Sequence, residues 1–204
     1  MKKILLFFTF IFSCFIWSTN ESSTSHIETI VLGSGCFWGA EKGYEALDGV
    51  IDAVSGYADG EGVKPSYREI TKFSNKFNPD NHAEVVEVTF NKNLISLDEL
   101  IVHYLESHDP TQLNRQGNDI GPQYRSVVYH KNEEEKLDVN EVIGYLQQNF
   151  VDDIVTEVSP LINFYVAENY HHNYFANNPN NPYCAMVVSP KISKTRAKHA
   201  SLYE

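Results

Sequence analysis

Basic residues are scarce in this chain. Its 204 residues include 16 Lys and Arg against 27 Asp and Glu, which gives a formal net charge of −11 at pH 7. An acidic surface repels nucleic-acid phosphates and anionic membranes, so the charge balance argues against both as partners. The hydrophobic content of 42% and the aromatic content of 13% are those of an ordinary globular domain, and two full domains would be cramped in this length. We therefore predict one acidic domain that binds no nucleic acid.

The N-terminus stands apart from the rest of the chain. Lys2 and Lys3 are followed by a nearly apolar run over residues 4–17, and residues 18–20 turn polar. This pattern is typical of a secretory signal peptide, and the run is shorter than the about twenty residues of a comfortable membrane span. We predict a signal peptide over residues 1–18, a linker over 19–25 and a domain over 26–204, in an exported protein that is periplasmic or secreted. An uncleaved anchor and a lipidated Cys14 are the less favoured alternatives.

Cysteine is rare, with three residues in the whole chain. Removal of the signal peptide would leave Cys36 and Cys184, and an exported protein meets an oxidising compartment in which such a pair can bond. A structural disulfide and a redox couple both remain open at this point. Histidines with the spacing of metal ligands are lacking too, because the adjacent His171 and His172 have no further ligands nearby in sequence, and we predict no metal site.

The stretch over residues 35–41 (GCFWGAE) places Cys36 between a predicted strand over 26–32 and a predicted helix. Free backbone N–H groups and the helix dipole stabilise an anion at such a junction, so we expect a lowered thiol pKa. A thiolate there is a nucleophile, and Phe37 and Trp38 could wall an apolar pocket beside it. The alternative is a cysteine that only packs in the core.

Elsewhere the pattern alternates between strands and helices. We predict strands over 84–90, 126–130 and 154–158, and helices that begin near residues 96, 132 and 167. Residues 50–67 and 71–82 look like loops, residues 111–125 a polar binding loop, and the Asn/Pro run over 177–182 a flexible tail before Cys184. The order fits a single-domain α+β or α/β sandwich without internal repeats.

A thiolate nucleophile also needs an acid or an oxyanion donor. The polar candidates are Tyr67, Glu84, Asp119 and Tyr124. Each has a plainer explanation: the tyrosines as half-buried packing, Glu84 as a charge on an edge strand, and Asp119 as a turn former. The sequence alone does not bring these residues together.

The motifs of the chain resemble a known family. GCFWGAE over residues 35–41 resembles the signature of the A-type peptide methionine sulfoxide reductases, and HAEVV over 82–86 resembles its second motif. The segment over 108–126, AENYH over 167–171 and NPYC over 181–184 continue the likeness in order. The resemblance runs from about residue 28 to residue 191. It implies the family's fold, a two-layer α/β sandwich with a ferredoxin-like core and a long irregular C-terminal tail.

The resemblance also implies a reaction, the thiol-dependent reduction of the S epimer of methionine sulfoxide, free or in oxidised proteins. By this resemblance Cys36 attacks the sulfoxide sulfur, Glu84 protonates its oxygen, and Tyr67 and Tyr124 hydrogen-bond that oxygen. Cys36 then becomes a sulfenic acid, and Cys184 on its flexible segment resolves it as a disulfide. The chemistry supports the choice of Glu84, since a protonated oxygen leaves sulfur more readily and burial raises a carboxyl pKa.

Further roles follow from the same resemblance. Phe37 and Trp38 would hold the methyl group of the substrate, and Asp119 would orient its backbone. No cofactor is implied beyond an external thiol reductant, a thioredoxin-like protein or dithiothreitol, and we expect a monomer that repairs oxidised proteins. The chain departs from the family in two places: Asp80 and Asn81 stand where Thr-Gly is usual, and the segment between Tyr67 and Glu84 is longer.

Two other functions are open on the residues alone. One is a Cys/His hydrolase or acyltransferase in which His82, His171 or His172 serves as the base for Cys36. The other is a secreted binding module with a structural Cys36–Cys184 disulfide.

Overall fold

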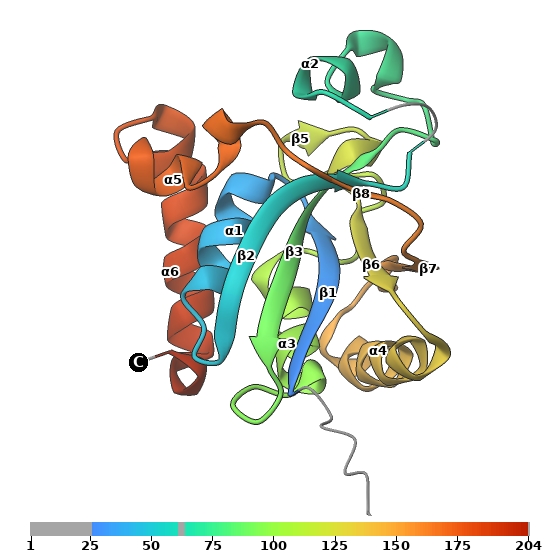
Figure 1. Cartoon of the computed structure of the whole chain (residues 1–204), viewed down its shortest axis with the longest axis vertical. Helices are drawn as coiled ribbons and strands as arrows, with labels where there is room; N and C mark the ends of the chain where they lie inside the picture. The colour runs from blue at the N-terminus through green and yellow to red at the C-terminus, as the bar shows by residue number, and fades with distance from the viewer. Residues whose placement is uncertain (1–25, 61–63, 204) are drawn as a thin grey trace, which may run out of the picture.

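The structure is a computed structural model that describes residues 26–60 and 64–203. The predicted signal peptide, the linker and Cys14 lie outside these residues. The protein is built around one curled sheet with helices against it (Figure 1). The strands are β1 (Ile27–Ser34), β2 (Val50–Ala58), β3 (Ala83–Asn91), β6 (Ser126–His130), β7 (Glu157–Pro160) and β8 (Phe164–Val166), with a separate small hairpin of β4 (Arg115–Gln116) and β5 (Asp119–Ile120).

The helices lie between and after these strands. The α-helices are α1 (Phe37–Glu45), α2 (Tyr67–Ile70), α3 (Leu97–Ser107), α4 (Glu133–Leu146), α5 (Tyr174–Asn177) and α6 (Ser189–Lys198). Shorter 3₁₀ turns are η1 (Phe73–Asn75), η2 (Pro122–Tyr124), η3 (Gln147–Asn149), η4 (Asn169–His171) and η6 (Ala200–Leu202), and η5 (Cys184–Val188) is a π-helical turn that runs into α6. Within the described residues, no helix is long and apolar enough to cross a membrane.

The sheet has the order β7-β6-β1-β3-β2-β8, and its pairs are antiparallel except for β6 with β7. Its centre follows the chain order β1-α1-β2-β3-α3-β6 with the spatial order β6-β1-β3-β2. This is the split βαβ arrangement of a ferredoxin-like core. The predicted α+β fold with a ferredoxin-like core is therefore confirmed.

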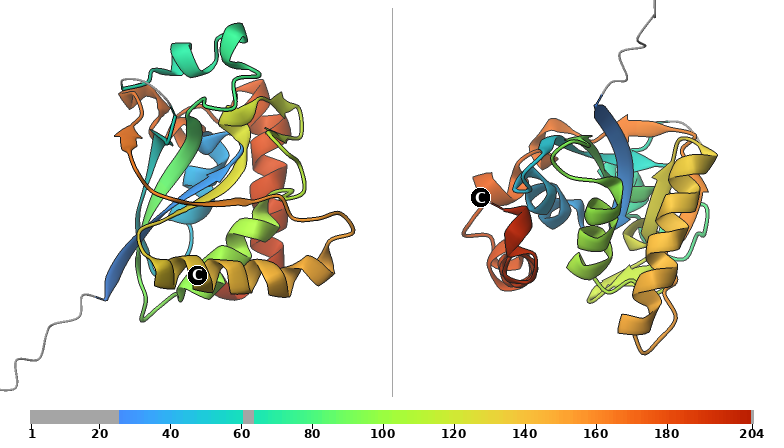
Figure 2. Two further views of the ribbon diagram at one scale, coloured as in Figure 1. Left: turned by 90° about the vertical axis from the view of Figure 1, so that its right-hand side faces the viewer. Right: turned by 90° about the horizontal axis from the view of Figure 1, so that it is seen from below.

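The core lies mainly on one face of the sheet. Ile30 and Leu32 of β1 point to the face that α1, α3 and α4 cover, whereas Val31 points to the other face. On that second face the irregular chain around Leu161 and Phe164 replaces helices as the cover (Figure 2). The two layers of the predicted sandwich are therefore the sheet and the helices on one face. The segment around Leu161 and Phe164 covers the opposite face.

Strong local signals placed several elements correctly. Ser96 caps α3 by accepting from the backbone N–H of Glu99, whose carboxylate returns to Ser96 as in a capping box. Asn132 caps α4 in the same sense by accepting from Glu135. Strand β6 has the predicted bounds, and β3 carries Glu84 as its second residue.

Four predictions of structure are corrected. Residues 50–58, interpreted as a loop, form the central strand β2, and β8 was not predicted. The strand predicted over 154–158 lies at Glu157–Pro160, and the helix predicted over 167–175 is two single turns, η4 and α5. The tail predicted over 177–182 is irregular only over residues 178–181, because α5 ends at Asn177 and the chain from residue 182 to Lys198 is helical.

Candidate active site

The strand-to-helix junction holds Cys36 as predicted. Strand β1 ends at Ser34, Gly35 turns the chain at a positive φ of 90°, and Cys36 is the N-cap of α1. A side chain at position 35 would be strained by that φ, and its Cβ would meet the side chain of Gln116 at 2.7 Å. Glycine at this position therefore brings the β4-β5 hairpin close to the thiol, which is partly exposed.

The electrostatics of the thiol correct a prediction. Burial raises the pKa of Cys36, and Glu84 raises it further once it is ionised, while the backbone N–H of Trp38 and the Tyr183 hydroxyl act in the opposite direction. The helix N-terminus thus contributes as expected, but desolvation and the neighbouring carboxylates outweigh it. The resting cysteine is a thiol rather than a thiolate, and the charge state of Glu84 governs how readily its proton is lost.

Glu84 lies in the middle of the sheet, not at an edge or in a loop. Strand β3 runs between β1 and β2, and Glu84 is 1% exposed opposite Tyr57. The backbone N–H of Phe37 donates to its Oε2 at 3.3 Å, and its Oε1 has no partner. Burial raises the pKa of Glu84 to about 8, an effect that the Phe37 N–H opposes. Glu84 is therefore protonated at neutral pH and has a free oxygen.

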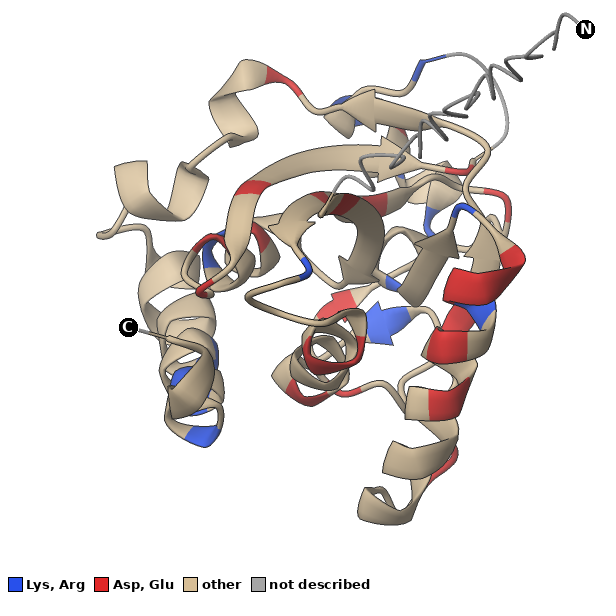
Figure 3. Cartoon of the chain, turned by 60° about the horizontal axis from the view of Figure 1, so that its bottom comes forward, with Lys and Arg blue, Asp and Glu red and all other residues tan. Residues whose placement is uncertain are grey.

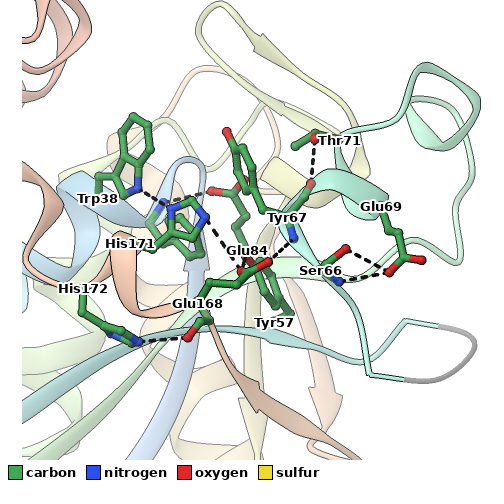
Figure 4. Close-up of polar contacts among 12 residues, drawn as sticks. Trp38, Tyr57, Ser66, Tyr67, Glu69, Thr71, Glu84, Glu168, His171 and His172 are labelled. Carbon is green, nitrogen blue, oxygen red and sulfur yellow. Dashed lines mark hydrogen bonds and ion pairs between the residues drawn. The ribbon is translucent and has the colours of Figure 1, made fainter.

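Two tyrosines from separate elements face this acid. Tyr67 is the first residue of α2, and Tyr124 ends the 3₁₀ turn η2. Burial raises the pKa of both phenols, and ionisation of Glu84 or Cys36 would raise it further. The structure therefore brings together the four residues that the sequence could not, and both phenols keep their protons as hydrogen-bond donors. Figure 4 shows Tyr67 beside Glu84.

Trp38 forms the aromatic wall of the site, whereas Phe37 belongs to the core. The Trp38 ring stacks on Tyr174 at 3.7 Å between centroids and meets the Tyr183 ring edge-on at 6.1 Å. Phe37 is 1% exposed, with its ring 4.9 Å from the ring of His171. Phe37 therefore supports the site from below, and Trp38 presents the apolar surface.

Asp119 closes another side of the site from the β4-β5 hairpin. The Tyr183 hydroxyl donates to Asp119 Oδ2 at 2.6 Å, so this hairpin is tied to the segment that precedes Cys184. A cavity of about 410 Å³ opens here, and its lining includes Cys36, Asp119, Tyr183 and Lys191. Tyr183 is a further residue of the site. In the sequence it was noted only as part of the NPYC motif, and no role was predicted for it.

Cys184 is a free thiol that does not sit on an irregular tail. It is fully buried as the first residue of the helical turn η5, and it does not line the cavity beside Cys36. Burial raises its pKa. Cys36 and Cys184 are both free thiols in this structure, and Cys184 is the buried one of the two.

A polar strap over the site was missed by the sequence analysis. Glu168 accepts from the Tyr57 hydroxyl at 2.6 Å and from the backbone N–H of Tyr67 at 2.9 Å, so it ties α2 to strand β2 (Figure 4). His171 is fully buried, and its Nδ1 accepts from the indole N–H of Trp38 at 2.9 Å. The AENYH motif contains both Glu168 and His171. Their hydrogen-bond partners lie 111 and 133 positions away in the sequence, so no local pattern indicates these contacts.

Comparison with known proteins identifies the family. A family model described as peptide methionine sulfoxide reductase matches residues 28–203. The chain belongs to this family. As a member of the methionine sulfoxide reductase A family it is an oxidoreductase that reduces methionine sulfoxide.

Relatives in the same family cover most of the chain. A peptide methionine sulfoxide reductase of Nautilia profundicola is 46% identical over 80% of this chain and 91% of its own length. One from Saccharolobus solfataricus is 41% identical, with 82% and 92% covered. Among solved structures, reduced Mxr1 of Saccharomyces cerevisiae is similar with a TM-score of 0.70 and 32% identity, covering 78% of this chain and 89% of Mxr1. The methionine sulfoxide reductase A of Corynebacterium diphtheriae gives a TM-score of 0.66 at 35% identity, with 78% of each chain covered.

None of the histidines considered as bases for a hydrolase is among the groups that act on the Cys36 thiol. His82 packs edge-on against Tyr165, and His172 faces the buried Glu41 at 3.5 Å. His171 accepts from Trp38, and its other nitrogen lies 3.9 Å from Glu168. Burial lowers the pKa of His171 to about 4, so the ring is neutral. This geometry disfavours the hydrolase hypothesis, in agreement with the family.

Proposed function

We propose that this enzyme reduces the S epimer of methionine sulfoxide, free or in oxidised proteins, through Cys36 and Glu84. The observation that carries the proposal is the buried carboxyl of Glu84, which has a pKa of about 8 and an unpartnered oxygen. The S–O bond of a sulfoxide breaks far more readily once the oxygen is protonated. A neutral carboxylic acid beside a thiol supplies this proton without a metal or an organic cofactor.

In the first step the sulfur of Cys36 attacks the sulfoxide sulfur. Glu84 gives its proton to the oxygen, and Tyr67 and Tyr124 donate hydrogen bonds to that oxygen as charge develops on it. The Glu84 carboxylate left behind takes up the thiol proton of Cys36. The S–O bond of the substrate then breaks as the protonated oxygen passes to the Cys36 sulfur, and the bond between the two sulfurs breaks with its electron pair left on the substrate. Methionine is released, Cys36 is left as a sulfenic acid, and Glu84 has regained its proton.

In the second step Cys184 resolves the sulfenic acid. Its thiol sulfur bonds to Cys36, and the oxygen leaves as water. No cysteine follows Cys184 in the sequence, so an external thiol attacks the resulting disulfide directly. A thioredoxin-like protein suits this role, and the support is a solved complex of yeast Mxr1 with Trx2, which is similar to this chain with a TM-score of 0.52 at 25% identity over 77% of it and 91% of Mxr1.

The substrate is held by apolar and acidic groups. Trp38 receives the methyl group, with Phe37 beneath it, because both rings are fixed by neighbouring aromatics. Asp119 accepts from a backbone N–H of the substrate. Its present partner, the Tyr183 hydroxyl, occupies the acceptor until substrate arrives.

The cellular setting is also part of the proposal. Residues 1–18 act as a signal peptide, and the domain repairs oxidised proteins outside the cytoplasm as a monomer under oxidative stress. Support comes from the basic and apolar N-terminus and from the acidic composition.

The test is turnover of the separated S and R epimers of a methionine sulfoxide derivative with dithiothreitol. We expect turnover of the S epimer only, none in Cys36→Ser, and release of one methionine per enzyme in Cys184→Ser before dithiothreitol is added. Turnover of the R epimer, or an active Cys36→Ser protein, would reject the proposal. Loss of the single release in Cys184→Ser would reject its role as the second thiol only.

A further inference from the structure

The longer segment between Tyr67 and Glu84 forms an arm at one end of the molecule, which we name the basic arm (residues 64–82). It leaves the sheet after β2, forms α2 and the turn η1, and returns to β3 (Figure 1). Its first helical residue is Tyr67, which faces Glu84 in the site. The arm is therefore joined to the site through Tyr67.

The tip of the basic arm exposes two phenylalanines. Phe73 is 81% exposed and Phe77 is 73% exposed, and no other phenylalanine in residues 26–60 and 64–203 is exposed. The two rings meet edge-on at 6.5 Å, and the ammonium of Lys76 lies 5.9 Å from the Phe77 ring. A cluster of exposed large apolar side chains marks an interaction site more often than a single exposed side chain does.

The base of the arm holds this tip in place. The side-chain N–H₂ of Asn81 donates to the carbonyls of Ile70 at 2.8 Å and Asn75 at 3.3 Å, and Asn75 donates to the carbonyl of Glu69 at 2.7 Å. Ile70 and Asn81 are both buried. The aromatic pair is thus presented from a fixed base, and Asn81, which departs from the family motif, is the residue that closes it.

The charge of the arm is opposite to that of the protein. The arm carries Lys64, Arg68, Lys72 and Lys76 against Glu69 and Asp80, whereas the whole chain has a net charge of −11. Acidic side chains instead gather over α3 and α4, at the far end of the molecule from the arm (Figures 1 and 3). An acidic ligand is therefore repelled by the body of the protein and attracted to the arm.

We propose that the basic arm binds the apolar and acidic residues that flank a methionine sulfoxide in an unfolded polypeptide. A free amino acid has no flanking residues, so the tip of the arm can act only on a substrate that continues beyond its methionine sulfoxide. Folded proteins bury their large apolar side chains, whereas unfolded segments present them. This inference rests on the proposed function and adds a substrate class to the same site.

The test compares two synthetic peptides, each with one S-epimer methionine sulfoxide, and the free N-acetyl derivative. One peptide carries Leu and Asp on both sides of the sulfoxide, and the other carries only Gly and Ser. We expect kcat/KM of Phe73→Ser/Phe77→Ser to fall about tenfold on the Leu/Asp peptide, the loss of one binding anchor, and to stay within twofold on the other two substrates. Lys72→Glu/Lys76→Glu, which keeps both rings, should show the same selective loss and recover at high salt.

The matched control is Leu137→Ser/Tyr145→Ser on α4, where the two side chains are 67% and 68% exposed. It should leave all three substrates unchanged. An equal loss on all three substrates by the arm variants would assign the arm to support of Tyr67 and overturn the proposal. A change confined to the KM for a thioredoxin-like donor, a loss of self-association in sedimentation, or no change at all would overturn it as well. No turnover of the free derivative by the unaltered protein would instead reject the proposed function.

Discussion

A single carboxyl group sets the pH range of the chemistry. Glu84 lies in a central strand, where burial separates it from water and one backbone N–H only partly compensates. Because its folded pKa is about 8 and its ordinary value is 4.5, the folded state holds a proton between these values that the unfolded state releases. The same shift that provides a general acid therefore weakens the fold as pH rises through this window.

The activity of the enzyme should fall as the pH rises through about 8, because Glu84 then loses the proton that it gives to the sulfoxide oxygen. Glu84→Gln should lower kcat by about 10²-fold or more and lose this descending limb. Single-turnover rates between pH 6 and 10 measure both effects. An unchanged limb in Glu84→Gln would assign it to another group.

The stability of the wild-type protein and of Glu84→Gln tests the raised pKa of Glu84 independently of activity. The wild-type free energy of unfolding should decrease between pH 5 and pH 8, whereas that of Glu84→Gln should vary less, since glutamine binds no proton in either state. Urea unfolding at several pH values measures the slope. Equal slopes would show that Glu84 is ionised in the folded protein.

His171 is a positioning residue in the proposed mechanism. It accepts from the Trp38 indole, so His171→Phe should leave that N–H without its partner and let the ring shift. We expect KM for the sulfoxide to rise by about threefold to tenfold, in line with one hydrogen bond, with a smaller effect on kcat. His171→Asn, which retains an acceptor, should recover part of the loss. Tryptophan fluorescence should move in His171→Phe, and an unmoved spectrum with normal KM would contradict the role.

At the scale of elements, the sheet depends on contacts that local sequence does not reveal. Gly56 of β2 is paired with Val166 of the neighbouring strand β8, and an added Cβ would lie 2.8 Å from the carbonyl of Tyr165 and closer still to the Phe164 ring. A glycine within a strand can mark such a close approach. In the sequence Gly56 interrupts the strand pattern. Residues 50–67 were therefore interpreted as a loop, and strand β2 was not predicted.

Gly56→Ala should therefore destabilise the protein by about 1–3 kcal/mol, because β8 must move away from β2. The matched control is Gly144→Ala in α4, where nothing lies within 4 Å of the added Cβ. That change should stabilise the helix by up to about 1 kcal/mol. Urea unfolding of both variants measures the two effects, and a neutral Gly56→Ala would show that β8 is loosely held.

The elements that could be predicted are those whose signals are local. The cap of α3 lies within four residues, and β6 is a run of buried β-branched and aromatic residues. The thiol pKa could not be predicted, because Cys36 is flanked by a favourable helix N-terminus in sequence but by Glu84 and Asp119 only in space. The family motifs indicated that Glu84 and Asp119 belong to the site. Their effect on the pKa of Cys36 depends on contacts between residues that are distant in the sequence, which no local pattern shows.

At the scale of the whole molecule, the proposed disulfide involves a thiol that is buried in the reduced protein. Cys184 is fully buried in η5, and a disulfide requires Cα atoms about 6 Å apart with suitable side-chain directions. Tyr183, tied to Asp119, stands at the start of this segment. The reduced structure is therefore one of two states through which the enzyme has to pass.

Oxidation by stoichiometric methionine sulfoxide should accelerate proteolysis within residues 177–188, since the helical turn that buries Cys184 has to open. Peptide mapping after brief protease treatment compares the reduced and oxidised proteins. Cys184→Ser, which forms no internal disulfide, serves as the control and should be cut at the same slow rate before and after sulfoxide. Equal rates in the wild-type protein would mean that the disulfide forms without opening of the turn.

The strand residues on either side of the basic arm are paired with each other in the sheet. Ala58 at the end of β2 and Ala83 at the start of β3 are register partners, so the intervening chain departs from and returns to a single point on the sheet. Chain that closes on itself in this way can change length at little entropic cost. We therefore expect the chain beyond the Ile70–Asn81 contact to tolerate replacement as long as Asn75 keeps its hydrogen bonds to Glu69 and Asn81. A replaced tip would redirect the enzyme to other oxidised chains while Cys36 and Glu84 remain in place.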